Sequence, residues 1–388
     1  MFMIQTLNKI SPAGLDRLPH DLYEIASEII HPDAVIVRSH KMHDMKLPRS
    51  LQAIARAGAG VNNIPVDRCS DRGIVVFNTP GANANSVKEL VLTGLFLTSR
   101  NILGGIDWAE GLIDKGKAVP KLIEKGKSQF VGPEIRGKKL GVIGLGAIGV
   151  MVANDAASLG MEVTGYDPFI SVDSAWGLSR DIKKARGFES LLSESDYISL
   201  HVPLDDETHE MINHSRFAIM KKGVRLLNFA RGGLVNTTDL KEALTKGIVQ
   251  KYITDFPDEE LLKTDGIICI PHLGAASAEA EENCAIMAAS QLRDFLEKGN
   301  IRNSVNFPDC DMDIRGDRRL VIANRNIPAM VGQITTVLAD DRINIVDMLN
   351  RSRGDLAYNI IDIDGAISDN SIEKIREIDG VLMARVIS

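Results

Sequence analysis

The chain has 388 residues, of which 44% are hydrophobic and 25% are charged, and its formal net charge is −7. This length and composition exclude a fibrous or wholly disordered chain and suggest two or three folded domains. The acidic balance, without any dense run of Lys and Arg, argues against a nucleic-acid partner, and no apolar stretch reaches the ~20 residues of a membrane span. Because the first residues, MFMIQTLNKI, also lack the apolar core of a signal peptide, we expect a cytoplasmic protein with no membrane partner.

The first hundred residues alternate weakly between strand-like and helix-like patterns. Strand-like apolar runs occupy 34–39, 51–58 and 73–81. They predict a small α/β unit at the start of the chain.

The middle third shows the same alternation more strongly. Its strand-like segments are 140–145, 162–167, 196–202, 224–230, 249–255 and 266–272. Helical segments lie between several of them, at 147–159, 214–221 and 238–246. Apolar strands separated by helices predict a parallel sheet that is covered on both faces.

The last part of the chain has a pattern of its own. A long helix over 277–298 and a linker over 300–317 are predicted first. The segments that follow are a strand at 318–325, a helix at 328–341, strands at 343–351 and 356–364, a helix at 371–378 and a strand at 381–387. The order βαββαβ predicts a ferredoxin-like domain.

The segment GLGAIG follows a predicted strand and opens a helix. In such a turn Gly144 permits the tight bend, Gly146 lets the backbone approach a pyrophosphate, and Gly149 lets helix and strand pack closely. Three glycines in a turn can also be purely structural, but Asp167 ends the next strand about 20 residues on, where an acid binds the adenosine ribose. Because the same carboxylate repels a 2′-phosphate, the pattern predicts NAD rather than NADP as the cofactor.

Polar residues follow three later strands of the predicted sheet. Arg231 lies in NFARGG, Asp255 opens the acidic stretch DFPDEE, and His272 lies in PHLG. Each residue alone is as often a solvated turn residue or unremarkable packing. On successive strand ends of one dinucleotide fold, an Arg, an acid and a His are the groups needed to orient a 2-hydroxy acid and to move its proton during hydride transfer.

Several motifs stand in a fixed order along residues 30–306. They are RAGAGVNNI (56–64), NTPGANANSVKEL (78–90), GLGAIG (144–149) with Asp167, HVPLDDETHEMIN (201–213), NFARGG (228–233), the DFP…E stretch and PHLGA (271–275). This set resembles the D-2-hydroxyacid dehydrogenases. NIPAMVGQI (326–334) and RINIVDM (342–348) are similar to an ACT domain, which directly follows the catalytic core in the phosphoglycerate-oxidising branch of that family.

The resemblance implies an α/β fold in which a Rossmann-type NAD domain is inserted into a flavodoxin-like substrate domain. The NAD domain would span 101–275, and the substrate domain would combine 1–100 with 276–306. A ferredoxin-like ACT regulatory domain would occupy 317–388.

The resemblance also implies the roles of the catalytic residues. Arg231 would orient the substrate and His272 would act as the general acid/base. The acid that orients the imidazole falls at Glu260 when counted from Asp255, whereas alignment on Phe-Pro leaves Glu259 as an alternative. Asp255 itself would hold the nicotinamide carboxamide.

Binding residues are implied in the same way. Contacts with NAD are expected at Thr79, Gly144, Gly146, Ala147, Ile148, Gly149, Asp167, Val202, Pro203, Phe229, Ala230, Asp255 and Gly274. Contacts with substrate are expected at Arg38, Gly58, Ala59, Gly60 and Val61.

The implied reaction is the NAD-dependent oxidation of 3-phospho-D-glycerate to 3-phosphohydroxypyruvate, which enters L-serine biosynthesis. Another D-2-hydroxy acid, such as glycerate, lactate or 2-hydroxyglutarate, is an alternative substrate, and a non-catalytic NAD-sensing regulator is an alternative function. A homodimer or homotetramer is expected. L-serine is an expected effector at paired ACT domains, through Asn324, Asn326 and Asn344, although Asn324 replaces a frequent His and Ala329 replaces the usual glycine.

The cysteines point to no other chemistry. Cys69, Cys269, Cys284 and Cys310 fall into no CxxC motif and no Cys/His ligand spacing. We therefore expect reduced, mostly buried thiols, and neither a disulfide framework nor a metal site.

Overall fold

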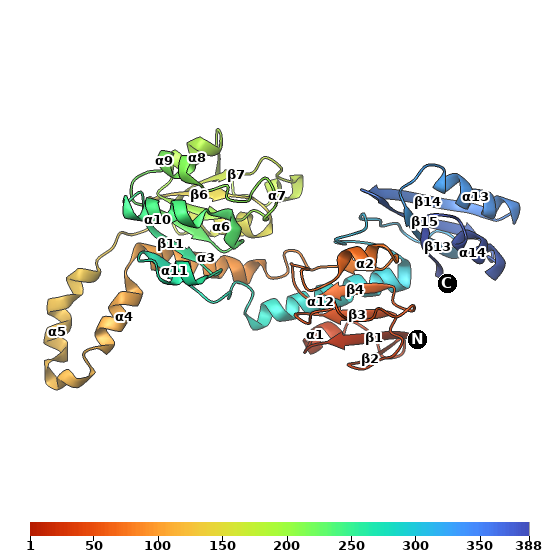
Figure 1. Cartoon of the computed structure of the whole chain (residues 1–388), viewed down its shortest axis with the longest axis horizontal. Helices are drawn as coiled ribbons and strands as arrows, with labels where there is room; N and C mark the ends of the chain where they lie inside the picture. The colour runs from red at the N-terminus through yellow and green to blue at the C-terminus, as the bar shows by residue number, and fades with distance from the viewer. Residues whose placement is uncertain (388) are drawn as a thin grey trace. The chain divides into compact units, whose positions relative to one another are not determined.

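A computed structural model describes residues 1–387, which form two compact units (Figure 1). Unit 1 joins Met1–Asn83 to the chain from Ala278 onward, and unit 2 is Ala84–Ser277. The first of these two boundaries was expected at residue 100 from the sequence, whereas it lies between Asn83 and Ala84. The difference is helix α3 (Ala84–Ser99), whose buried Val87, Val91 and Leu95 belong to the core of unit 2.

Unit 1 begins with a five-stranded parallel sheet of order β2-β1-β3-β4-β5. Its strands are β1 (Phe2–Leu7), β2 (Tyr23–Ala26), β3 (Ala34–Val37), β4 (Ala53–Arg56) and β5 (Val75–Phe77). The order 2-1-3-4-5 is that of flavodoxin-like sheets. Its helices are α1 (Pro12–Leu15), α2 (Val66–Ser70) and the long α12 (Ala278–Lys298). Cys284, Ala288 and Phe295 of α12 pack in one core with the strands.

The end of the chain adds a four-stranded antiparallel sheet of order β14-β15-β13-β16. In chain order its elements are β13 (Arg318–Arg325), α13 (Met330–Asp340), β14 (Asn344–Arg353), β15 (Leu356–Asp364), α14 (Asp369–Arg376) and β16 (Val381–Ile387). The predicted βαββαβ order is confirmed. The two helices cover one face of this sheet, and Val321 and Tyr358 of the other face join the core that contains Phe77 and Phe295.

Unit 2 contains a seven-stranded parallel sheet of order β12-β11-β10-β9-β6-β7-β8. Its strands are β6 (Lys139–Ile143), β7 (Glu162–Tyr166), β8 (Lys183–Lys184), β9 (Tyr197–Leu200), β10 (Val224–Asn228), β11 (Val249–Thr254) and β12 (Ile267–Cys269). Its remaining helices are α6 (Ala147–Ser158), α7 (Val172–Trp176), α8 (Phe188–Glu194), α9 (His214–Ile219), the 3-10 turn η3 (Gly232–Leu234), α10 (Thr237–Thr245) and α11 (Glu259–Leu262). The chain runs outward from β6 in both directions, as in Rossmann folds, so the predicted covered parallel sheet is confirmed.

A helical arm extends from unit 2 and was not predicted from the sequence (Figure 1). It consists of α4 (Ile102–Glu110), η1 (Ile113–Ala118), α5 (Val119–Gly126) and η2 (Lys127–Phe130), and none of these elements contains a buried residue. The rings of Trp108 and Phe130, whose centroids lie 5.5 Å apart, hold its two sides together. No helix within residues 1–387 is long and apolar enough to cross a membrane.

Candidate active site

The glycine loop between β6 and α6 has the shape of an anion cradle. Gly144 has φ of 89°, and a Cβ there would lie 2.6 Å from the carbonyl oxygen of His201. A Cβ on Gly149 would lie 1.9 Å from the carbonyl oxygen of Gly144. At Gly146, the N-cap of α6, a Cβ would meet no atom within 4 Å, and no side chain caps the helix. The loop therefore leaves open space in front of backbone N–H groups at a helix N-terminus, where a pyrophosphate fits.

Asp167 lies beside this cradle, directly after β7. Its Oδ2 accepts a hydrogen bond from the backbone N–H of Leu145 over 2.8 Å, and its Oδ1 accepts one from Phe169 over 2.8 Å. Both bonds fix the carboxylate against the glycine loop. A negative charge at this point favours ribose hydroxyls over a 2′-phosphate.

Arg231 is held by Asn228, a residue that the sequence analysis did not single out. The buried Asn228 Oδ1 accepts from the backbone N–H groups of Ala230 and Arg231 over 3.2 and 3.3 Å. Its Nδ2 donates to the carbonyl of Arg231 over 2.8 Å and to the hydroxyl of Tyr252 over 3.1 Å. Burial raises the pKa of Tyr252 to about 12, so this hydroxyl stays protonated. The backbone of Arg231 is thereby fixed while its side chain remains exposed.

Asp255 follows β11 and is 1% exposed. Its Oδ2 accepts from the backbone N–H of Gly274 over 3.1 Å, whereas its buried Oδ1 has no hydrogen-bond partner among the described residues. Burial raises the pKa of this carboxyl group, and the Gly274 N–H and the charges of His272 and Arg231 act in the opposite direction. An unpartnered buried oxygen is an acceptor for an amide N–H, as the expected carboxamide contact requires.

His272 follows β12, next to β11 in the sheet. Its backbone N–H donates to the carbonyl of Asp255 over 3.1 Å, and its φ of 33° is strained for a residue other than glycine. The exposed imidazole packs on Phe256, with ring centroids 4.8 Å apart. The structure therefore brings Arg231, Asp255 and His272 together at the carboxyl ends of three adjacent strands.

The two alternative acids do not join this cluster. Glu260 forms an ion pair with Lys241 over 2.6 Å, and Glu259 forms one with Lys263. Within residues 1–387 neither carboxylate bonds to His272. The reason is local: Asp258 caps the short helix α11 by accepting from the N–H of Leu261, and the exposed Glu259 and Glu260 begin that helix beside lysines.

The other expected NAD contacts of unit 2 lie along the same sheet edge. They are Val202 and Pro203 after β9, Phe229 and Ala230 after β10, Gly274 after β12, and Ala147 and Ile148 at the start of α6. Strand β9 lies between β10 and β6 in the sheet. The residues predicted for NAD in this unit thus share one edge, as the carboxyl ends of parallel strands must.

The expected substrate residues belong to unit 1. Arg38 follows β3 and pairs with Glu281 of α12 over 2.6 Å. Arg56, which the sequence analysis did not single out, donates from Nε to the carbonyl of Arg38 over 3.1 Å and from Nη1 to the carbonyl of Gly60. The buried Thr79 donates its N–H to Gly58 over 3.1 Å. Arg38 and Arg56 thus flank the loop formed by Gly58, Ala59, Gly60 and Val61.

The expected effector residues do not meet within one chain. Asn324 is buried and already bonded, because its Oδ1 accepts from Asn359 over 2.7 Å and its Nδ2 donates to the carbonyl of Arg325 over 2.7 Å. Asn326 lies near that end of the sheet and donates to the carbonyl of Gly354. Asn344 pairs with Asp364, at the opposite end of the same sheet.

One group of metal-binding residue types lies elsewhere in unit 2. His214, Asp239 and Glu242 each place a ligand atom within 4.8 Å of the others. Asp239 already accepts from the backbone N–H of His214 over 2.8 Å, and Glu242 pairs with Lys246. These groups are therefore engaged with one another and with a lysine.

Known proteins are similar to this chain over most of its length. The family described as "D-isomer specific 2-hydroxyacid dehydrogenase, NAD binding domain" matches residues 103–274. The D-3-phosphoglycerate dehydrogenase of Haemophilus influenzae is 32% identical over 95% of this chain and 90% of its own length. That of Escherichia coli K12 is 31% identical over 90% of this chain and 85% of its own length.

A solved structure agrees with the fold. The NAD+-bound 3-phosphoglycerate dehydrogenase of Entamoeba histolytica matches with a TM-score of 0.59 and 26% identity. The match covers 79% of this chain and 98% of that chain.

Proposed function

Because this chain belongs to the D-isomer specific 2-hydroxyacid dehydrogenase family and is an NAD-dependent dehydrogenase, we propose that it oxidises 3-phospho-D-glycerate to 3-phosphohydroxypyruvate. The observation that carries this substrate is the similarity to D-3-phosphoglycerate dehydrogenases along nearly the whole chain. Two guanidinium groups, Arg38 and Arg56, beside the loop 58–61 add support, because arginine binds phosphate and carboxylate through paired hydrogen bonds. The product would enter the phosphorylated route to L-serine.

The chemistry follows from the three strand ends. Bound NAD supplies the acceptor for the hydride that leaves C2 of the substrate. Arg231 holds the substrate carboxylate and the C2 oxygen with its planar fork, and neutral His272 takes the proton of the C2 hydroxyl. The unpartnered Oδ1 of Asp255 would accept a hydrogen bond from the nicotinamide carboxamide of bound NAD. The backbone of the glycine loop would hold the pyrophosphate of NAD, and Asp167 would hold the adenosine ribose.

We assign the orienting acid to Glu260, with Glu259 as the alternative. The Lys241 ion pair would have to open for Glu260 to approach His272. This step costs little, because exposed ion pairs contribute only about 0–1 kcal/mol.

A substrate panel tests the proposed reaction. Initial rates of NADH formation at ~340 nm are compared for 3-phosphoglycerate, D-glycerate, D-lactate and D-2-hydroxyglutarate, each with NAD and with NADP. We expect the highest kcat/KM with 3-phosphoglycerate and NAD. A higher kcat/KM for an unphosphorylated acid would identify that acid as the substrate in place of 3-phosphoglycerate. No turnover with any of the acids would favour an NAD-sensing regulator.

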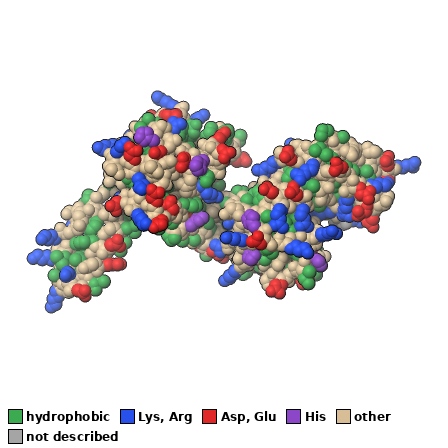
Figure 2. All heavy atoms as spheres, in the orientation of Figure 1, with side chains coloured by type: hydrophobic (Ala, Val, Ile, Leu, Met, Phe, Trp, Pro, Cys, Tyr) green, Lys and Arg blue, Asp and Glu red, His purple; other side chains and the backbone are tan. Residues whose placement is uncertain are grey.

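We also propose that the chain forms a homo-oligomer through the helical arm. The arm exposes Ile113 to 79%, together with Ile102, Leu103 and Ile106, and Val131, directly after the arm, is 82% exposed. Figure 2 displays green hydrophobic side chains among the blue lysines over this arm. A second copy would cover them. Light scattering tests this: Ile113→Glu should lower the mass of the assembly, and the equally exposed Ile30→Glu should not.

The C-terminal βαββαβ domain is proposed as an ACT domain that binds L-serine. Since Asn326 and Asn344 lie at opposite ends of one sheet, both can touch an effector only if two copies pair along β14. Inhibition by L-serine that is lost in Asn344→Ala would support this arrangement. The cytoplasm is the location we propose, and four free cysteines, three of them buried, are typical of a reducing compartment.

A further inference from the structure

A groove in unit 1 is lined by none of the residues considered above. We call it the linker groove; it has a volume of about 820 Å³ and runs between α12 and the segment 300–314. Met287, Gln291, Asp294 and Lys298 line it from one side of α12, at spacings of three or four residues that place them on a single helix face. Arg17, which follows α1, also lines it.

Gln291 is the least expected residue in the linker groove. It is 9% exposed, yet neither its Nε2 nor its Oε1 has a hydrogen-bond partner among the described residues. Buried amides are nearly always bonded, because an unpaired donor or acceptor away from water is unfavourable. An amide in this state can give one hydrogen bond and accept another from a ligand.

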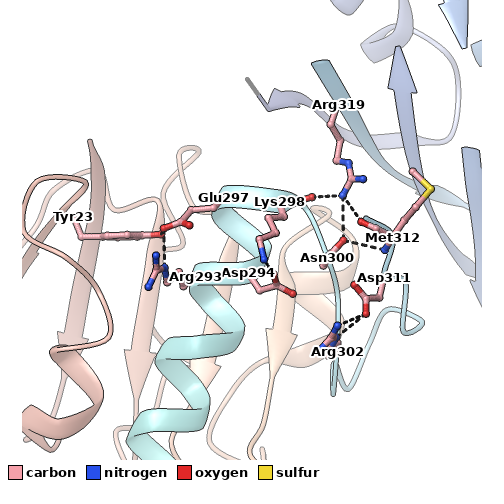
Figure 3. Close-up of polar contacts among 10 residues, drawn as sticks. All are labelled: Tyr23, Arg293, Asp294, Glu297, Lys298, Asn300, Arg302, Asp311, Met312 and Arg319. Carbon is pink, nitrogen blue, oxygen red and sulfur yellow. Dashed lines mark hydrogen bonds and ion pairs between the residues drawn. The ribbon is translucent and has the colours of Figure 1, made fainter. Parts of the chain in front are cut away.

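The walls of the linker groove carry both signs of charge. Most of these charges pair with each other along the wall, as Figure 3 shows: Lys298 with Asp294 over 3.1 Å, Arg293 with Glu297 over 3.1 Å, and Arg302 with Asp311. Two do not. Within residues 1–387, neither the guanidinium of Arg17 nor the carboxylate of Asp313 forms an ion pair or a side-chain hydrogen bond, and both line the groove.

We propose that the linker groove binds a ligand that carries both an ammonium and a carboxylate group, namely a free α-amino acid or a short peptide. In this assignment the guanidinium of Arg17 binds the carboxylate, the carboxylate of Asp313 binds the ammonium group, and the buried amide of Gln291 offers a further donor and acceptor to the same ligand. A simple anion or cation would leave one of the two unpaired wall charges without a partner. The proposal does not depend on the substrate or on the paired ACT domains.

The linker groove is also connected to the C-terminal sheet. Asn300 and Met312 line it, and both accept from Nη1 of Arg319, over 3.3 and 2.8 Å (Figure 3). Arg319 on β13 is 1% exposed and pairs with the buried Asp362 of β15 over 2.7 Å. A ligand that orders the segment 300–314 therefore stabilises the contacts of that segment with Arg319 of the C-terminal sheet. We expect such a ligand to raise the melting temperature of the full chain.

Calorimetric titration of the full-length protein without NAD tests the proposal. The probes are L-serine as a free amino acid, triglycine as a peptide, succinate as an anion and ethanolamine as a cation. We expect one of the first two to bind and the single-charge probes to bind about tenfold more weakly or worse, which is the loss of one charge-assisted contact. Arg17→Gln, Asp313→Asn and Gln291→Leu should each raise the Kd of the binding probe about tenfold.

Two control variants test whether the binding occurs in the linker groove. Arg180→Gln, which removes an exposed arginine of unit 2, should leave the Kd unchanged. Asn326→Ala, which removes a residue of the proposed effector site, separates L-serine binding at that site from binding in the linker groove. Equal binding of succinate, binding that Asn326→Ala abolishes while the groove variants retain it, or no heat from any probe at about 10 mM would each overturn the proposal. Circular dichroism of each variant verifies that the fold is retained.

Discussion

The backbone N–H of His272 donates to the backbone carbonyl of Asp255 over 3.1 Å, which ties the end of β12 to the end of β11. The carboxylate of Asp255 in turn accepts from the N–H of Gly274, two residues after the histidine. The loop that carries the imidazole is therefore fixed to the strand that carries the buried acid. This arrangement accounts for the left-handed φ of His272, since two bonds to one residue over-determine the loop.

The first prediction concerns proton transfer by His272. His272→Gln should lower kcat by about 10²–10⁴-fold, because a positioned general acid/base typically contributes that much. NADH affinity, read by fluorescence titration, should stay within about threefold, since the glycine loop and Asp167 are untouched. His20→Gln, which changes an exposed histidine of unit 1, is the control, and near-wild-type turnover of His272→Gln would refute the assignment.

The second prediction separates the two acids. Glu260→Gln should move the rising limb of the pH–rate profile to lower pH, because an adjacent carboxylate favours the imidazolium form of His272. Glu259→Gln should leave the profile in place. The opposite pattern would assign the role to Glu259, and no movement in either variant would leave Asp255 as the acid that acts on the histidine.

Asp167 supports a prediction about cofactor choice. Asp167→Ser should lower the NAD/NADP ratio of kcat/KM by about tenfold or more, because the variant loses the bonds to the ribose and the repulsion of the 2′-phosphate. The variant also loses an acceptor for the N–H groups of Leu145 and Phe169, so its melting temperature is measured alongside. A wild-type preference for NADP would contradict the ribose contact.

His201 gives a prediction about acid stability. Burial lowers the pKa of His201 from 6.5 to about 4, and its Nε2 lies 2.8 Å from the hydroxyl of Ser199. Between these two values the unfolded chain binds a proton that the folded chain does not, so stability is lost as the pH falls from 6.5 toward 4. His201→Gln should therefore show a shallower decline of melting temperature over this range, while His43→Gln should follow the wild type.

The last prediction uses the backbone of Ala329. This residue precedes α13 with φ of 69°, a left-handed conformation that costs an alanine about 1 kcal/mol or more relative to glycine. Ala329→Gly should raise the free energy of unfolding by about this amount, measured as a higher urea midpoint. Ala339→Gly, within the same helix, should lower it by about 0.5–1 kcal/mol. A destabilising Ala329→Gly would mean that the methyl group makes a contact worth more than the strain.

The local pattern of the sequence was by itself sufficient to predict much of the fold of this protein. The glycine spacing from Gly144 to Gly149 with Asp167, and the apolar strands that precede Arg231, Asp255 and His272, predicted the sheet and the edge at which these residues lie. The strands Arg318–Arg325 and Leu356–Asp364 match the predicted segments residue for residue. The backbone preference and the burial pattern of a segment depend on residues that are neighbours in the sequence. The carboxyl ends of parallel strands lie at one edge of a sheet whatever the details of packing.

Only the tertiary structure decided which side chains bond to each other. Glu260 pairs with Lys241 rather than His272, Asn228 braces Arg231, and Arg56 reaches back to the carbonyl of Arg38. The side chain of Asn324 is hydrogen-bonded to that of Asn359. The unpartnered amide of Gln291 becomes evident only when α12 packs beside the segment 300–314. Each of these contacts depends on the distance between side chains from separate elements, and that distance is set by how the elements pack rather than by the order of residues within any one of them.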